Sequence, residues 1–564
     1  MTDGKTARSG GRVLVDALVV NGAELVFCVP GESYVTALDA FYDAPQVRVV
    51  ACRHEAGAGN MAEAYGKLSG RPGICFVTRG PGATHASIAV HTARQDSTPL
   101  ILFVGQVARG NAEREAFQEI DLPRMFGPIT KWAAQIDDAR RIPEYVARAF
   151  HVATSGRAGP VVLALPEDML RDEVAVADLR ATPPSLPHPG AGEIARFREI
   201  VESAQRPLMI LGGSGWDAQA CAAIRRFAER SGIPTTCSFR RQALFDNRHP
   251  LYAGDVGIGI NPALAARIGE ADLLIAVGGR LGEMPNGNYT LVAAPRPRQR
   301  LVHVHADPDE LGRVFAADLA INAAPAHFAA AVADLAVTGR ERWAGWARDA
   351  RADYEESLRP PSGGEGVDLA AIVAHLSARL PDDAIVANGA GNFTTWVHRF
   401  YQYREPGTQL APTSGAMGYG VPAAIAAKLY RPQRTVVAFA GDGDFLMTGQ
   451  ELATAVQYGA AVVFLVVNNG MYGTIRMHQE RHHPGRVIAT DLVNPDFAAY
   501  ARAFGAHGVV VERTADFANA FEEAVRCGRP ALIELRVNAD VITPRTTLQA
   551  IRRTAEAARA GSGE

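Results

Sequence analysis

The chain has 564 residues, too many for a single hydrophobic core, and at about 100 to 200 residues per domain we expect three or four domains. Its 57 basic and 60 acidic residues give a formal net charge of −3, which argues against nucleic acid or an anionic membrane surface as the main partner. No apolar stretch approaches the roughly 18 residues that span a bilayer, and the polar amino terminus lacks the apolar core of a secretory signal. We therefore expect a cytoplasmic protein that acts on small molecules.

Two stretches rich in proline and glycine divide the chain. Residues 181–193 read ATPPSLPHPGAGE, and residues 356–366 contain LRPPSGGEG. Such compositions are typical of linkers between folded parts. They predict three domains at residues 1–178, 192–345 and 366–550, followed by a polar, frayed tail.

Each predicted domain alternates short apolar runs with helical stretches. Apolar runs of about three to six residues, bounded by glycine or proline, indicate parallel strands that are buried on both faces. All three domains are therefore expected to be α/β, each with a mostly parallel sheet flanked by helices. In chain order, strands are expected at 47–51, 74–78, 100–104, 161–165, 208–211, 273–277, 301–304, 385–387, 436–440, 462–467 and 531–535. Ligands of such sheets bind at the carboxyl ends of the strands.

The first of these strands leads into Cys52-Arg53-His54-Glu55 and a helix that we expect to end at Ser69. Taken alone, Glu55 is most simply a first-turn glutamate that interacts favourably with the helix dipole.

The predicted middle domain opens with the strand at 208–211, followed by Gly213-Ser214-Gly215-Trp216-Asp217-Ala218. This GxGxxA pattern is a weak signal for a dinucleotide. No acidic residue ends the next strand, where a ribose would bind.

The third predicted domain carries two polar clusters, each directly after an apolar strand. Gly441-Asp442-Gly443 follows the strand at 436–440, and Asn468-Asn469 ends the strand at 462–467, with a helical segment expected at 448–457. A right-handed crossover brings both clusters to one edge of the sheet. Carboxylate and amide oxygens suit Mg²⁺, and flanking glycines let the backbone approach phosphate oxygens. Either cluster alone could be a turn or a cap; together they predict a site for a metal-bound diphosphate.

GDG followed by NN resembles the thiamine diphosphate signature. The resemblance extends over nearly the whole chain, and the nearest family is the acetolactate-synthase-like group. It implies a pyrimidine-binding domain, a central Rossmann-like domain and a diphosphate-binding domain. It also implies thiamine diphosphate and Mg²⁺ as cofactors. The implied metal ligands are the side chains of Asp442 and Asn469 and the main-chain carbonyl of Met471.

The resemblance changes the interpretation of Glu55. In thiamine enzymes, the glutamate of RHE in this position hydrogen-bonds N1′ of the aminopyrimidine and so promotes loss of the thiazolium C2 proton. In the family this glutamate and the metal ligands come from different subunits. We therefore expect a homodimer at least, or a tetramer, with the active site at the subunit interface.

The resemblance implies further contacts in the same pocket. Gln118, after Phe117, resembles a glutamine near the reacting carbonyl, so it joins Glu55 as a predicted catalytic residue. Met447 resembles the apolar residue beneath the bent cofactor, although it could simply be a core methionine. The remaining predicted cofactor contacts are Pro30, Asn392, Gly415, Met417, Gly441 and Gly443. Phe393 stands where the family often has histidine, which weakens the match at Asn392.

Three positions depart from the acetohydroxyacid synthases. Those enzymes have small residues after Pro-Gly, where this chain has Glu32-Ser33, and lysine where this chain has Glu167. A tryptophan that helps to choose their acceptor is replaced by His478. The cofactor chemistry therefore carries over, whereas the substrate stays open. Relatives hold FAD, ADP or nothing in the central domain, and the sequence leaves FAD open without favouring it.

The expected function is that of a thiamine diphosphate- and Mg²⁺-dependent 2-keto acid decarboxylase and carboligase, acetolactate-synthase-like, with pyruvate as the default donor. A second interpretation is a thiamine-dependent carbon–carbon lyase that resembles benzaldehyde lyase or 2-hydroxyacyl-CoA lyase. A third, non-enzymatic interpretation is a nucleotide-sensing or structural descendant of the fold. The expected small-molecule partners are 2-keto acids or aldehydes.

Overall fold

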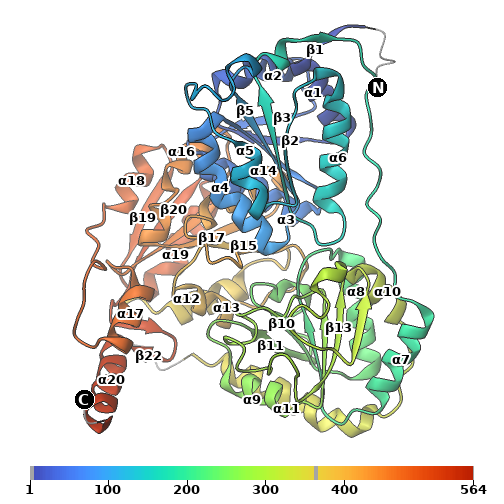
Figure 1. Ribbon diagram of the computed structural model, residues 1–564. Coiled ribbons are helices and arrows are strands. Elements are labelled where there is room, and N and C mark those ends of the chain that lie inside the picture. The colour runs from blue at the N-terminus through green and yellow to red at the C-terminus, as the bar shows by residue number, and fades with distance from the viewer. Residues whose placement is uncertain (1–5, 361–365, 563–564) are drawn as a thin grey trace. The chain divides into compact units, whose positions relative to one another are not determined.

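The computed structural model describes residues 6–360 and 366–562, and the chain divides into two units (Figure 1). Unit 1 comprises residues 6–186 with 425–432 and 453–458, and unit 2 comprises the rest of the described chain. Three six-stranded sheets, each parallel throughout, organise these units, which confirms the predicted α/β class. In the part of the chain that the structure describes, no helix is both long enough and apolar enough to cross a membrane.

The sheet of unit 1 has the strand order β3-β2-β4-β5-β7-β6. Its strands are β2 (Leu25–Cys28), β3 (Arg48–Ala51), β4 (Gly73–Thr78), β5 (Leu100–Gln106), β6 (Trp132–Gln135) and β7 (Pro160–Pro166). The helices are α1 (Gly10–Val20), α2 (Val35–Tyr42), α3 (Glu55–Ser69), α4 (Arg79–Asp96), α5 (Leu122–Phe126) and α6 (Ile142–Thr154), and the short strands β1 (Arg8–Ser9) and β8 (Glu173–Val174) pair antiparallel. Alternate residues of the central strands pack with α1, α2 and α6 in one apolar cluster. The strand order reverses between β2 and β4, which is where ligands bind in open α/β sheets.

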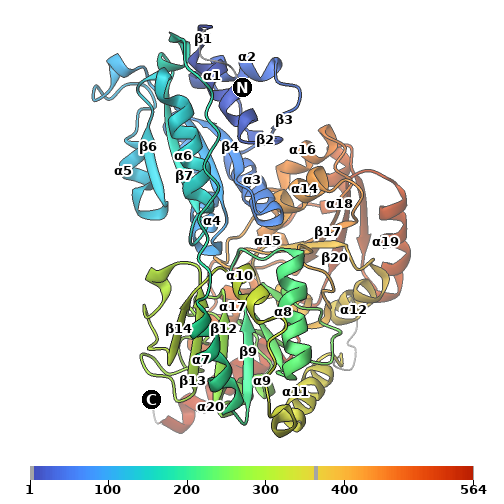
Figure 2. The ribbon, with the colours of Figure 1, turned by 90° about the vertical axis from the view of Figure 1, so that its right-hand side faces the viewer.

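The first sheet of unit 2 has the order β11-β10-β9-β12-β13-β14. Figure 2 labels β9, β12, β13 and β14 of this sheet. Its strands are β9 (Pro207–Leu211), β10 (Thr235–Ser238), β11 (Tyr252–Val256), β12 (Leu273–Val277), β13 (Arg300–His305) and β14 (Leu319–Asn322). The flanking helices are α7 (Ala191–Glu202), α8 (Ala218–Ser231), α9 (Pro262–Glu270), α10 (Pro325–Val332) and α11 (Ala344–Ser357). Met209 and Leu211 belong to one apolar cluster and Leu208 and Ile210 to another, so successive strand residues enter cores on opposite faces.

The second sheet of unit 2 has the order β16-β15-β17-β18-β20-β19. Its strands are β15 (Ile385–Asn388), β16 (Gln409–Leu410), β17 (Val436–Gly441), β18 (Val463–Asn468), β19 (His507–Val511) and β20 (Ala531–Arg536). The helices that follow its strands include α12 (Leu369–Arg379), α13 (Thr394–Phe400), α15 (Asp442–Phe445), α17 (Gly473–His482), α18 (Phe497–Ala503) and α19 (Phe517–Arg526). Two further helices, α14 (Gly420–Tyr430) and α16 (Leu452–Gln457), contribute residues to both units. The order reverses between β15 and β17.

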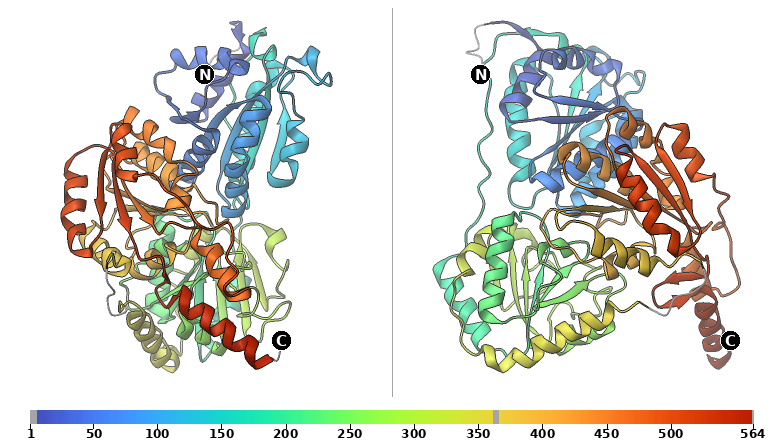
Figure 3. Two further views of the ribbon diagram at one scale, coloured as in Figure 1. Left: turned by 90° about the vertical axis from the view of Figure 1, so that its left-hand side faces the viewer. Right: turned by 180° about the vertical axis from the view of Figure 1, so that it is seen from behind.

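The structure can be compared with three further expectations. The tail after residue 550 is not frayed: α20 (Leu548–Ser562) is a continuous helix, preceded by the hairpin of β21 (Val541–Thr543) and β22 (Thr546–Thr547) (Figure 3). The helical segment expected at 448–457 is present as a 3-10 turn at Gly449–Glu451 that runs into α16 (Leu452–Gln457), and a further short helix, α15, precedes it from Asp442. The linker expected at 356–366 overlaps the end of α11, and its residues 361–365 lie outside the described part of the chain.

Candidate active site

Asp442 is the first residue of α15, directly after β17, and is almost completely buried. Its Oδ1 accepts a hydrogen bond from the Gly443 amide at 2.9 Å, and its Oδ2 accepts one from the Gly470 amide at 2.8 Å. Burial raises the pKa of Asp442, and these hydrogen bonds oppose that rise. The Gly470 bond joins the turn after β17 to the turn after β18, so the two polar clusters meet as predicted.

The turn after β18 is held by three asparagines. Asn468, the last residue of the strand, donates to Glu534 Oε1 on β20 at 2.8 Å. Asn469 Oδ1 accepts from the Met471 amide at 3.2 Å. The side-chain nitrogen Nδ2 of Asn494 donates two hydrogen bonds, one to Asp442 Oδ2 at 2.8 Å and one to Asn468 Oδ1 at 2.9 Å. Sequence reasoning missed Asn494, because nothing in the pattern around it indicates that its loop returns to this edge.

A second buried carboxylate, Asp444, connects two other loops to α15. Its Oδ1 accepts from the amides of Gly418 at 2.7 Å and Ala390 at 3.2 Å. A Cβ atom at Gly389 would lie about 2.1 Å from Oδ2, so only glycine fits there. Burial raises the pKa of Asp444 to about 7. This residue was also missed, although the acidic pair in GDGD was a visible signal.

The loop before α14 passes close to the same turn. Gly415 and Gly418 have φ of 72° and 77°, in the left-handed region that favours glycine. A Cβ atom at Gly418 would lie 2.7 Å from the Cβ of Met447. The Met447 side chain is 46% exposed. Its predicted place beneath the cofactor stays a prediction.

A cavity of about 240 Å³ opens where these loops converge, at the reversal of strand order between β15 and β17. Its lining includes all but one of the cofactor contacts predicted in this part of the chain; Met447 lies outside it. The contacts that line it are Asn392, Gly415, Met417, Gly441, Asp442, Gly443, Asn469 and Met471. Residues at the starts of α13, α15 and α17 also line it, and the positive end of a helix dipole favours an anion. Asn392 is fixed to α17, because its Oδ1 accepts from Thr474 Oγ1 at 2.9 Å.

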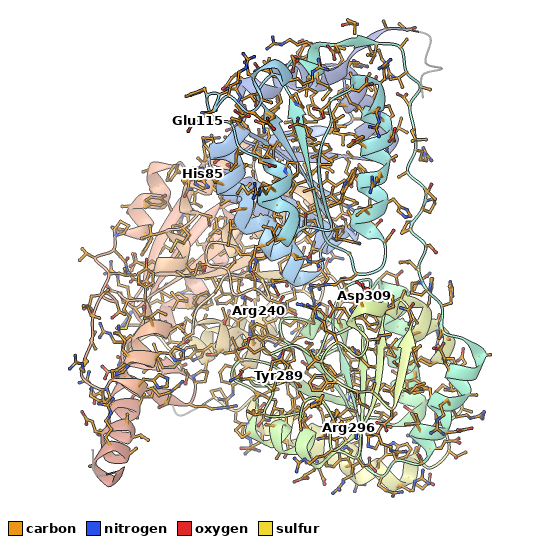
Figure 4. The ribbon with its side chains drawn as sticks, viewed as in Figure 1. His85, Glu115, Arg240, Tyr289, Arg296 and Asp309 are labelled. Carbon is orange, nitrogen blue, oxygen red and sulfur yellow. The ribbon has the colours of Figure 1, made fainter. Side chains whose placement is uncertain are left out.

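Unit 1 presents a second set of predicted residues. Glu55 is the first residue of α3, after β3, and its side chain is 13% exposed. Its Oε2 lies 2.9 Å from Nδ1 of His85, which Figure 4 labels on α4. His54 caps α3 by accepting from the Ala56 amide, and its ring stacks on His85. Burial and the neighbouring His85 lower the pKa of His54. No pattern in the sequence connects His85 with Glu55.

Gln118 lies in a tightly turned loop before α5. Its φ is 65°, and Glu113 and Glu115 in the same loop also have positive φ (Figure 4 labels Glu115). Glu119 holds the loop by accepting hydrogen bonds from the amides of Glu113 and Ala116. The Gln118 side-chain oxygen is buried and has no hydrogen-bond partner among the described residues. Backbone strain and an unpaired buried polar atom are features of functional sites.

Pro30 directly precedes a close contact at the reversal of strand order in unit 1. A Cβ atom at Gly31 would lie 2.4 Å from the Cβ of Thr78, the last residue of β4. The hydroxyls of Ser33 and Thr78 are 2.6 Å apart. The loop that carries Pro30 therefore packs against Thr78 at the start of α4, and the predicted contact of Pro30 with the cofactor stays a prediction.

Comparison with protein families assigns most of the chain. The N-terminal thiamine pyrophosphate-binding domain of thiamine pyrophosphate enzymes matches residues 8–125. The central domain of the same enzymes matches residues 194–332, and their C-terminal thiamine pyrophosphate-binding domain matches residues 389–535. The chain belongs to the thiamine pyrophosphate enzyme family. Each of the three matches contains one of the six-stranded sheets or most of its strands.

Curated relatives of this thiamine pyrophosphate enzyme include acetolactate synthases. The large subunit from Corynebacterium glutamicum is 31% identical, over 94% of this chain and 87% of the relative. The large subunit from Parasynechococcus marenigrum is 33% identical over the same shares. The isozyme 2 large subunit from Escherichia coli is 30% identical, over 94% of this chain and 96% of the relative. The chain is therefore homologous to acetolactate synthase large subunits along nearly its whole length.

The residues of this enzyme fit a metal-bound diphosphate. The cavity offers a buried carboxylate, an amide oxygen and a main-chain carbonyl, which is an all-oxygen donor set suited to Mg²⁺. Glycines at 441 and 443 keep side chains out of the space beside Asp442; a Cβ at Gly443 would lie 2.5 Å from the Tyr472 ring. A buried carboxylate with a raised pKa gains most from a neighbouring cation.

Proposed function

We propose that this thiamine pyrophosphate enzyme decarboxylates a 2-keto acid in the presence of thiamine diphosphate and Mg²⁺ and joins the remaining acyl group to a second carbonyl compound. Pyruvate is the default donor, in line with the acetolactate synthase relatives. The observation that carries the proposal is the cavity in which Asp442, Asn469 and Met471 meet the starts of three helices.

The residues of unit 2 bind and orient the cofactor. Asp442, Asn469 and the Met471 carbonyl would hold Mg²⁺, which would neutralise the diphosphate charge. The positive ends of the helix dipoles of α15 and α17 would face the phosphate oxygens. Gly415 and Met417 would contact the aminopyrimidine through their backbone, and Met447 would lie against the cofactor.

The residues of unit 1 handle protons and the substrate. Glu55 holds the proton that it shares with N1′ of the aminopyrimidine, and His85 keeps the Glu55 carboxylate in place through its Nδ1. Gln118 offers its amide to the reacting carbonyl. When bound, thiamine diphosphate supplies the carbon nucleophile that attacks the donor carbonyl and takes up the electron pair released with CO2.

The protein is proposed to act as an oligomer. A homodimer is the minimum functional unit, or a tetramer, with the active site shared between subunits. Sedimentation of the holoenzyme tests this, and a monomer with full activity would contradict it.

The central domain works without FAD, and the absorption spectrum of the purified protein near 450 nm tests that.

A carbon–carbon lyase is the second candidate function, and one observation favours it. Glu32 and Glu167 place two carboxylates at the substrate edge of unit 1, where a second keto acid would be repelled. A lyase would cleave a 2-hydroxy ketone or a 2-hydroxyacyl thioester without an anionic acceptor.

Two measurements separate these functions. Calorimetry of thiamine diphosphate with and without Mg²⁺ should show binding only with the metal; absence of binding would favour a non-enzymatic descendant of the fold. The loaded protein is then given pyruvate or a 2-hydroxy ketone. CO2 release with a carboligation product, either acetolactate or acetoin identified before any acid treatment, supports the decarboxylase and carboligase. Cleavage of the hydroxy ketone with no CO2 from any 2-keto acid would replace the proposal with the lyase.

A further inference from the structure

Arg79 is the first residue of α4, directly after β4, and its guanidinium is shared by two carboxylates from other loops. Its Nη1 lies 3.3 Å from Glu32 Oε1, and its Nη2 lies 2.7 Å from Glu167 Oε2. The Arg79 side chain is 10% exposed, and its φ is 30°. Its Nε is buried and has no hydrogen-bond partner among the described residues. Both acidic partners follow strands of the same sheet, Glu32 after β2 and Glu167 after β7.

The turn that carries Arg79 also touches both predicted catalytic residues. The amide of Gly80 donates to the Gln118 carbonyl at 2.9 Å. A Cβ atom at Gly82 would lie 3.6 Å from Glu55 Oε1. One turn of helix therefore connects the acidic pair, Gln118 and Glu55, at the reversal of strand order between β2 and β4.

Carboxylates outnumber the guanidiniums that they engage around Arg79. A second arginine, Arg109 after β5, is held by Asp168 through its amide and its Nε, both at 2.9 Å. It also donates to Asp172 Oδ2 at 2.9 Å. Arg53, which follows β3, donates to Gln457 Oε1. The two guanidiniums of Arg79 and Arg109 thus face four carboxylates. A guanidinium already engaged by two carboxylates cannot offer its full charge to a substrate carboxylate, and the excess negative charge repels one.

We propose that Glu32, Arg79 and Glu167 select an uncharged acceptor, an aldehyde, over a second 2-keto acid. The inference rests on the proposed function. In the reaction, the donor loses CO2 as its C1–C2 bond breaks. The electron pair of that bond forms the new bond to the aldehyde carbon, and the aldehyde oxygen takes a proton. The product is an uncharged 2-hydroxy ketone, with no oxidant or reductant required.

The experiment measures acceptor choice in the holoenzyme with thiamine diphosphate and Mg²⁺. Pyruvate is the donor, and acetaldehyde competes with pyruvate as acceptor. Total CO2 release reports donor consumption, and mass spectrometry gives the ratio of acetoin to acetolactate before any acid treatment. We expect the unmodified enzyme to favour acetoin on the order of tenfold or more at equal acceptor concentrations.

Variants locate the preference. Glu32→Gln, at an exposed side chain, and Glu167→Gln should each shift the product ratio several-fold toward acetolactate, and Glu167→Lys should shift it on the order of tenfold. Asp43→Lys is the control for Glu167→Lys, because it makes the same charge change at an exposed residue between α2 and β3, at the opposite edge of the sheet. It should leave the ratio of acetoin to acetolactate unchanged. Thermal unfolding of each variant shows whether it is folded.

The outcomes separate the two levels of inference. If no 2-keto acid in a panel of donors releases CO2, the proposed function fails and the acceptor inference falls with it. If CO2 is released but acetolactate predominates, or if Glu32→Gln and Glu167→Gln leave the ratio unchanged, the acceptor inference alone is overturned. An equal shift in Asp43→Lys would also overturn it, because the effect would then come from net charge.

Discussion

Asn494 donates a hydrogen bond to Asp442 Oδ2 at 2.8 Å, so the predicted metal ligand is oriented by a residue 52 positions further along the chain. The same Nδ2 donates to Asn468 Oδ1 at 2.9 Å. Asn494 therefore links the turn after β17 to the turn after β18, although it belongs to neither. Residues that orient metal ligands commonly affect metal affinity without touching the metal.

Asn494→Ala is expected to weaken Mg²⁺-dependent binding of thiamine diphosphate by about 10- to 100-fold, because the Asp442 carboxylate loses one of its two orienting donors at Oδ2. Calorimetry measures the change. Asn322→Ala removes a similar half-buried hydrogen bond, to the His305 carbonyl in the first sheet of unit 2, and should leave cofactor affinity unaltered. Unchanged affinity in Asn494→Ala would show that Asp442 needs no such support.

Asp442→Ala is expected to abolish retention of thiamine diphosphate, because a diphosphate in this cavity would lose the main anionic ligand of its metal. The apoprotein should remain folded, since the variant removes a buried carboxylate whose pKa is raised by burial. Calorimetry and near-ultraviolet circular dichroism test the two parts. A folded variant that keeps the cofactor after gel filtration would refute the metal assignment.

Glu55→Gln should retain cofactor affinity within a few-fold, yet slow turnover by a factor on the order of 100 or more, because a carboxamide cannot exchange the required proton. Steady-state kinetics with saturating thiamine diphosphate and Mg²⁺ measure the effect. Turnover equal to that of the unmodified enzyme would remove Glu55 from the mechanism. Glu63→Gln is a poor control, because Glu63 is buried and ion-paired with Lys67; Glu24→Gln, at a half-exposed side chain, is suitable.

Asp444→Ala is expected to lower cofactor affinity by about tenfold or more, because the Gly418 and Ala390 amides lose their shared acceptor and two loops of the cavity are released. Asp444→Asn keeps an oxygen acceptor and should bind the cofactor more tightly than the alanine variant. Equal affinities for the two variants would show that the hydrogen bonds do not position these loops.

The carboxyl-terminal helix gives a prediction on pH. Glu480 on α17 is buried and pairs with Arg552 on α20, which donates from Nε at 2.8 Å. Arg552 lowers the pKa of Glu480 from its usual value of 4.5. The ion pair of Glu480 and Arg552 therefore stabilises the folded state fully above pH 4.5. This stabilisation is lost as the pH falls from there through the lowered pKa of Glu480.

Arg552→Ala is expected to lower the free energy of unfolding by about 1 to 2 kcal/mol at pH 7. The loss is no larger because Arg552 is half-exposed and water partly screens its charge. Urea unfolding at pH 7 and near pH 3 measures the difference, which should shrink at the lower pH. Limited proteolysis should release the α20 segment more readily from the variant. Arg553→Ala, at an exposed neighbour, serves as control. A difference that persists undiminished at low pH would contradict the role of the Glu480 charge.

The sequence by itself determined the α/β class, the chain positions of eleven strands to within one or two residues, and the family; seven further strands of the three sheets were not predicted. It could do so because buried parallel strands need continuous apolar runs, and because Asp442 and Asn468-Asn469 end two such runs. It also placed Glu55 at the start of a helix. These features depend on local pattern, which the chain carries without reference to its partners.

Only the tertiary structure decided what these residues touch. Asn494, His85 and Arg79 come from loops and helices whose sequences carry no distinctive pattern, and their roles arise where separate chain segments converge. Glu32 and Glu167 were visible as departures from relatives, but their common contact with Arg79 depends on strand order. The tail after residue 550 was misjudged because α20 is stabilised by Glu480 on another helix, which no local composition records.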